Sequence, residues 1–195
     1  MFKIGDKIVY PNHGAGIIDS IEKKEFLGEE KDYFILKMPI GSMDISIPMA
    51  NIDKMNIREV IGKKEGDEVL RILDDDPTQM SNNWNVRYRQ NQEVIKSGDI
   101  FEIAKMVRNL AILDKEKGLS TTEKKLLNRA RRIMASELVM AGSLEKEKAE
   151  EMIDESIGLW LFSLKMITRS INEANNSIGY YANWSCSWYC NIKCG

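Results

Sequence analysis

The hydrophobic pattern changes its period near residue 56, and this change limits the possible folds more than any other feature of the sequence. Before it, short β-branched and aromatic runs are separated by turns that contain Gly and Pro. In the last of these runs Ile45 and Ile47 alternate with Asp44 and Ser46, which is the two-residue period of a half-buried strand. After residue 56 the apolar residues recur at helical spacing. The sequence therefore predicts an α+β fold, with a β domain followed by a helical one.

The β domain is expected to cover residues 1–56. Strands are predicted over residues 7–10, 16–21, 32–37 and 43–48, with turns over residues 11–14, 27–30 and 39–42. Four or five short strands with tight turns in fewer than 60 residues favour a small, strongly bent sheet or barrel.

Residues 57–157 are expected to form a compact α-helical bundle, joined to the β domain by a hinge near residues 53–58. A first helix over residues 66–73 ends at Asp74-Asp75-Asp76-Pro77, because proline disfavours helix in the residue before it. The next helix is capped by Ser81 or Asn82, and another follows over residues 99–117. Ser120-Thr121-Thr122-Glu123 is a capping box that begins a helix to about residue 140. Ser143 is expected to cap a last helix, to about residue 155.

Residues 158–195 form an atypical tail to which the sequence assigns no structure. The tail is poor in charge and contains all three cysteines, Cys186, Cys190 and Cys194. Their spacing matches neither a zinc ribbon nor a zinc finger, so no metal site is expected.

The segment from residue 83 to residue 135 is basic, with twelve Lys and Arg residues against six Asp and Glu residues. On a helix over residues 124–134, one arc is apolar and the opposite arc is polar. The polar arc contains five cations and no acid, whereas an ordinary surface helix intersperses acids for pairing. Contact with nucleic-acid phosphates is the favoured interpretation, and a solvated helix face is the alternative. The polar arc consists of Lys124, Lys125, Asn128, Arg129, Arg131 and Arg132.

Trp84 lies among polar residues at a predicted helix start, next to Asn83 and Asn85. An exposed indole there could wedge against a base step in a minor groove, with Arg87 and Arg89 on the flanking phosphates. The competing interpretation is a tryptophan packed in the core between helices.

No catalytic constellation is visible, and we expect no enzyme activity and no cofactor. His13 is the single histidine, and it lies in a turn without an evident partner for acid–base work. The N-terminus lacks the apolar core of a signal peptide, and no window reaches the roughly 18 apolar residues of a membrane span. A cytoplasmic protein is therefore expected.

The sequence resembles the CarD/CdnL family of bacterial RNA-polymerase-binding transcription regulators, whose N-terminal module also occurs in the transcription-repair coupling factor. The resemblance covers about residues 1–157 in the family's order. It is carried by residues 2–14 and 33–37, Asn83-Trp84, Arg87-Tyr88, Gly118-Leu119-Ser120, Glu123-Lys124 and Ala130-Arg131.

The resemblance implies a Tudor-like N-terminal domain that binds a lobe of the polymerase β subunit, partly by pairing sheet edges. Lys24, Ile45, Ser46 and Ile47 fall at the implied polymerase interface, and Ser46 replaces an arginine of better-known members. The resemblance also implies a helical domain on promoter DNA at the upstream edge of the −10 region. There Trp84 would wedge into the minor groove and stabilise the open complex, including at ribosomal RNA promoters.

Two binding functions remain open at this point. The first is a regulator, expected to be a monomer, that bridges RNA polymerase and promoter DNA. The alternative is a polymerase-binding adaptor whose helical domain recruits another protein. Affinity for DNA that falls with salt would distinguish the first from the second.

Overall fold

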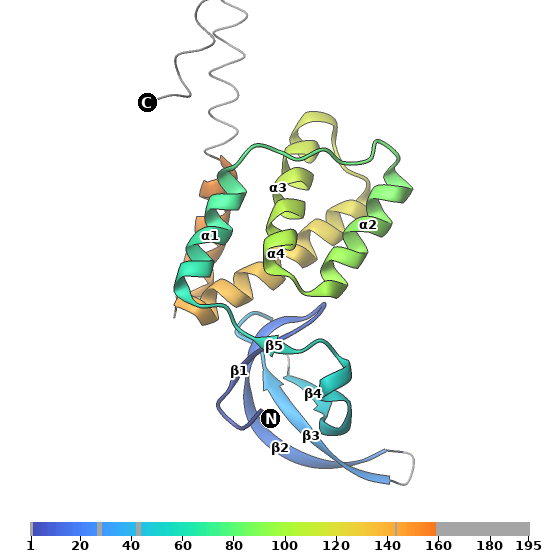
Figure 1. The fold of residues 1–195 in the computed structure, drawn as a ribbon, viewed down its shortest axis with the longest axis vertical. Helices are drawn as coiled ribbons and strands as arrows, with labels where there is room; N and C mark the ends of the chain where they lie inside the picture. Colours follow the sequence, from blue (N-terminus) through green and yellow to red (C-terminus); the bar gives the residue numbers. More distant parts are fainter. Residues whose placement is uncertain (1, 27–28, 42–43, 143, 159–195) are drawn as a thin grey trace, which may run out of the picture. The chain divides into compact units, whose positions relative to one another are not determined.

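A computed structural model of the protein describes residues 2–26, 29–41, 44–142 and 144–158. The N-terminal part is a five-stranded antiparallel sheet in the order β4-β3-β2-β1-β5. Helices follow it in the chain (Figure 1), which confirms the α+β class. The strands are β1 (Lys7–Tyr10), β2 (Gly14–Phe26), β3 (Glu29–Lys37), β4 (Asp44–Pro48) and β5 (Arg58–Glu59).

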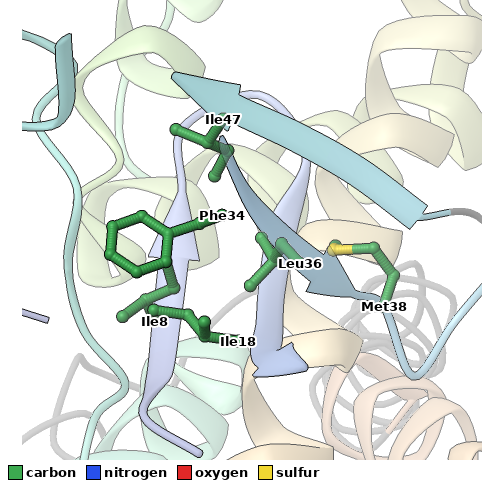
Figure 2. Close-up of a cluster of buried hydrophobic side chains, with 6 residues drawn as sticks. All are labelled: Ile8, Ile18, Phe34, Leu36, Met38 and Ile47. Carbon is green, nitrogen blue, oxygen red and sulfur yellow. The ribbon is translucent and has the colours of Figure 1, made fainter. Parts of the chain in front are cut away.

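One face of the sheet carries the core of the β domain (Figure 2). β1, β2, β3 and β4 each contribute to it, and every member is at most 9% exposed. In β4 the predicted alternation is confirmed, since Ile47 is buried in this core and Ser46 is exposed. The register shifts between Ile18 and Ser20 at a bulge in β2. The core residues are Ile8, Ile18, Phe34, Leu36, Met38 and Ile47.

The sheet extends beyond the expected end of the β domain at residue 56. A 3-10 helix, η1 (Met49–Lys54), occupies the start of the expected hinge. The chain then returns to the sheet, where Arg58 and Glu59 of β5 pair with Val9 and Ile8 of β1. The hydrophobic pattern did not indicate β5, because a two-residue strand is too short to show a period.

The helices are α1 (Lys63–Asp74), α2 (Trp84–Ser97), α3 (Ile100–Lys117) and α4 (Thr121–Gly142), and residues 146–158 are also helical. α3 is the central helix and contacts α1, α2 and α4. The cap of α2 is Asn83, whose side-chain oxygen accepts from the Asn85 N–H, and not Ser81 or Asn82 as expected. Ser143 and residues 159–195, with the three cysteines, lie outside the described residues.

The start of α4 follows its sequence signature. The Ser120 N–H donates to the Glu123 carboxylate at 3.2 Å, and the Glu123 N–H donates to Ser120 Oγ at 3.3 Å. These reciprocal bonds satisfy two amides at a helix start and confirm the predicted capping box.

The β1–β2 turn packs directly on α4. The Ala15 N–H donates to Ser136 Oγ at 2.8 Å in a buried contact. Gly14 has φ +106°, and a Cβ built on it would lie 2.3 Å from Ser136 Oγ. Glycine is therefore required here for its conformation and for its lack of a side chain.

Gly14→Ala is expected to destabilise the protein by about 1–3 kcal/mol more than Gly41→Ala does. Gly41 has the same φ of +106°, but a Cβ there would meet nothing within 4 Å. Gly41→Ala therefore introduces the backbone strain alone. The difference in stability between the two variants measures the cost of the close approach of Gly14 to α4. Urea unfolding of both variants measures it, and equal losses would contradict the close packing of Gly14 on α4.

Candidate nucleic-acid and protein interfaces

Trp84 is the first residue of α2 and is exposed over 51% of its surface. Val86, two residues on, is 42% exposed. The buried residues of α2, Asn91 and Ile95, lie farther along the helix. Large aromatic side chains are usually mostly buried, so an exposed one calls for an explanation. The exposure of Trp84 excludes the interpretation that it packs in the core between helices.

Arg87 does not lie at the surface as a phosphate contact would require. Its Nε and NH2 groups donate to Glu123 Oε1 at 2.8 and 2.5 Å, and its NH1 group donates to the Ser81 carbonyl at 2.9 Å. The side chains of Arg87 and Glu123 are only 11% and 3% exposed. In the isolated protein Arg87 is held by a carboxylate 36 residues later in the chain, and its contact with a phosphate stays a prediction.

Burial by itself raises the pKa of Glu123, but hydrogen bonds from Ser120 and Arg87 outweigh it and hold the pKa below its ordinary value. Glu123 therefore joins the cap of α4 to the first turn of α2. Because Arg87 also binds the Ser81 carbonyl, this network holds the chain on both sides of Trp84.

The polar arc of α4 is partly neutralised by acids from other helices. Lys124 pairs with Asp114 of α3 at 3.3 Å, and Arg131 pairs with Asp154 in the helix over residues 146–158. Lys124 and Arg131 therefore each have an acidic partner in the isolated protein, and their contact with phosphates stays a prediction. A count along one helix could not reveal acids supplied by its neighbours.

Three cations of α4 have no ion pair within the described residues: Lys125, Arg129 and Arg132. We call them the basic stripe. Their spacing of four and three residues places them on one face of α4, over about 10 Å of helix. Arg89 of α2 is likewise exposed, and no residue in the described ranges pairs with it. Of the residues expected to contact nucleic acid, these four and Trp84 are available to do so.

The expected polymerase-binding residues lie at one edge of the sheet. β4 is the last strand in the sheet order, so its outer edge pairs with no other strand of the described chain. Lys24 Nζ of β2 donates to Ser46 Oγ of β4 at 2.8 Å and pairs with Glu22 at 3.3 Å. These exposed polar side chains therefore lie together on the solvent-facing side of the sheet.

Ile45 and Ile47 have a different role from Ser46. Ile47 is 1% exposed in the core, and Ile45 packs against the same core. The Ile47 side chain is therefore buried away from a partner, and the predicted contact of this residue with the polymerase would be made by its main chain. Pairing through the main chain is what strand addition to a sheet edge uses.

A second ion pair, with a buried carboxylate that the sequence did not lead us to expect, connects the sheet to the helices. Arg58 of β5 donates to both carboxylate oxygens of Glu137 at 2.5 and 2.9 Å, and also to the Gly98 carbonyl. The Ile61 N–H donates to the same carboxylate, which is fully buried. The sequence does contain a sign of this ion pair. Glu137 is a charged residue on the apolar face of α4, which it shares with Ala130 and Ile133.

Among the described residues, no group of three or more His, Cys, Asp and Glu side chains is placed to hold a metal ion. The described helices also include none that is long and apolar enough to cross a membrane.

Comparison with known proteins agrees with this architecture in both halves. The CarD-like/TRCF RID domain matches residues 2–61, and the CarD C-terminal domain matches residues 68–154. The chain is 43% identical over 148 residues to a Bacillus subtilis (strain 168) protein named "Putative transcription factor YdeB". That alignment covers 75% of this chain and 97% of the relative. The RID match indicates an interaction with RNA polymerase in general terms. The chain therefore belongs to the CarD/CdnL family and is a transcription factor of the CarD type.

Proposed function

We propose that the protein binds the RNA polymerase β subunit through the β4 edge and promoter DNA through its helical domain. Trp84 then wedges into the minor groove at the upstream edge of the −10 bubble and stabilises the open complex, including at ribosomal RNA promoters. The observation that carries the proposal is the exposed indole at the first turn of α2, in a helical domain whose exposed cations include four that no acid in the described residues neutralises.

The mechanism needs no chemical step. A protein that binds the opened promoter better than the closed one shifts the equilibrium by the difference between its two affinities. A stacked aromatic supplies about 1–3 kcal/mol, and an apolar wedge unstacks a base step that opening has already weakened. The Arg87–Glu123 network contributes by limiting the positions that Trp84 can take before DNA arrives.

The basic stripe and Arg89 supply the part of DNA affinity that does not depend on sequence. Each phosphate that they neutralise releases counterions, so affinity falls as salt rises. The three cations of the stripe lie in a row along one face of α4. A row of cations can follow a DNA backbone better than scattered cations can.

Lys125→Gln is expected to lower the slope of log affinity against log salt by about one unit, equally on all DNA sequences. Arg131→Gln is the matched control, because Arg131 is already paired with Asp154 and should change the slope less. Fluorescence anisotropy with labelled duplexes over a range of salt measures both. A loss confined to one DNA sequence would contradict backbone contact.

One observation favours the adaptor as a second candidate. Trp84 and Val86 are both exposed apolar residues in the first turn of α2, and another protein could cover either of them. An adaptor would bind DNA weakly and with little salt dependence. The lifetime of open complexes formed by purified polymerase with wild-type protein or Trp84→Ala tests the main proposal directly.

A further inference from the structure

A cavity of about 410 Å³ lies where the β1–β2 turn and the β3–β4 region face α4. Ligand cavities for small molecules have volumes of about 300–1,000 Å³, so the size is sufficient. Two kinds of side chain line it. Arg129 and Arg132 form a cationic side, and Met38, Ile45 and Ile133 form an apolar one.

The cationic side lacks a counter-ion in the described part of the protein. Arg129 and Arg132 are three residues apart on α4, so their guanidinium groups extend from neighbouring turns of one helix face. Like charges at this spacing repel each other, whereas Lys124 and Arg131 on the same helix have acidic partners. Guanidinium groups bind phosphate oxygens in a bidentate, planar geometry. A phosphoryl group is therefore the natural complement of this side.

His13 contributes a planar surface beside the arginines. Its ring stacks on Tyr10, with centroids 4.8 Å apart and planes 9° from parallel, and its main-chain N–H donates to the Tyr10 carbonyl at 3.0 Å. Burial, followed by the nearby charge of Arg129, lowers the pKa of His13. The imidazole is therefore neutral at pH 7, and its nitrogens can donate or accept a hydrogen bond without adding charge.

We propose that this cavity binds a nucleoside phosphate, with the phosphoryl group between Arg129 and Arg132 and the base against Met38, Ile45 and His13. A flat, largely apolar body attached to an anionic phosphoryl group matches the two sides of the cavity. The same chemistry is carried by a free nucleotide and by a nucleotide within a DNA strand. The proposal does not depend on insertion of Trp84 into DNA.

The single histidine makes the test direct, because the imidazole ¹H NMR signals need no assignment. Full-length protein is titrated with adenosine 5′-monophosphate, guanosine 5′-monophosphate, inorganic phosphate and adenosine. We expect either monophosphate to shift the His13 signals saturably, with a Kd of about 1 mM or lower. A phosphoryl group near the ring also raises the pKa of His13, which the same spectra record.

Two substitutions define the site. Arg129→Gln and Arg132→Gln should each raise the Kd for the monophosphate at least tenfold, while Lys115→Gln, in the last turn of α3 and outside the cavity, leaves it unchanged. The proposal is overturned if no saturable shift occurs, if the two arginine variants bind as the wild type does, or if inorganic phosphate binds as tightly as the nucleotides.

Competition with a DNA duplex separates the two sources. Displacement of the monophosphate by duplex assigns the cavity to a nucleotide of the DNA strand, and simultaneous binding assigns it to a free nucleotide. Salt-dependent DNA binding without any His13 response would overturn the cavity proposal and leave the DNA-binding proposal standing.

Discussion

Trp84→Ala is expected to remove most of the open-complex lifetime that the protein adds, a loss of about 5- to 150-fold where the wild-type effect is that large. The range corresponds to about 1–3 kcal/mol for one stacked aromatic side chain. The indole is half exposed and is not among the buried residues of α2, so the free energy of unfolding should change by no more than about 0.5 kcal/mol. Dissociation of preformed open complexes after addition of a competitor measures the lifetime, and urea unfolding measures stability.

Val86→Ala is the matched control for this result. Val86 is also exposed and lies two residues along the same helix, but it has no aromatic face. If Trp84 acts as a wedge, Trp84→Ala should lose much more of the added open-complex lifetime than Val86→Ala does. Trp84→Phe should keep part of that lifetime. If both alanine variants lower polymerase or partner binding equally and the open-complex lifetime is unaffected, the first turn of α2 docks a protein and the adaptor function is correct. A large drop in thermal stability for Trp84→Ala would contradict the exposed position itself.

Features set by neighbouring residues could be predicted from the sequence. The β4 alternation and the capping box of Ser120 and Glu123 depend on local geometry, and both are confirmed. The exposure of Trp84 was also suggested locally, since Asn83 and Asn85 are typical of a helix start and not of a core.

Features set by contacts between distant residues could not be predicted in the same way. Arg87 and Glu123 are 36 residues apart, and Arg131 and Asp154 are 23 apart. A local charge pattern counts a cation without its partner, so it overestimates the number free for phosphates. The subset that is exposed and unpaired among the described residues, Lys125, Arg129, Arg132 and Arg89, emerges only when α3 and the helix over residues 146–158 are placed against α4.

Arg87→Met is expected to destabilise the protein by about 3–5 kcal/mol at pH 7. Removing one partner of a buried ion pair leaves the other charge, here Glu123, without compensation. Arg89→Met is the control, because Arg89 is exposed and unpaired among the described residues, and its loss should stay within about 0.5 kcal/mol. Chemical unfolding followed by circular dichroism compares the stability of the two variants. Equal small losses would contradict the buried position of Arg87.

The size of the Arg87→Met effect should depend on pH. In the wild type the pKa of Glu123 lies below its ordinary value of 4.5, so its ionised form stabilises the fold above that pH. That contribution is lost as pH falls through the folded-state pKa. Without Arg87, Glu123 loses two of the influences that lower its pKa, a hydrogen bond and a nearby positive charge, so the variant's deficit should be greatest near neutral pH and shrink in acid.

A second substitution tests whether the unpaired charge is the cause. In Arg87→Met/Glu123→Gln the side chain at residue 123 is neutral, and glutamine can still complete the capping box with Ser120. The double variant should therefore recover part of the stability lost in Arg87→Met, because no charge remains buried without a partner. If the double variant is less stable than Arg87→Met, the cost comes from the lost bond between the Arg87 guanidinium and the Ser81 carbonyl, and not from the isolated carboxylate.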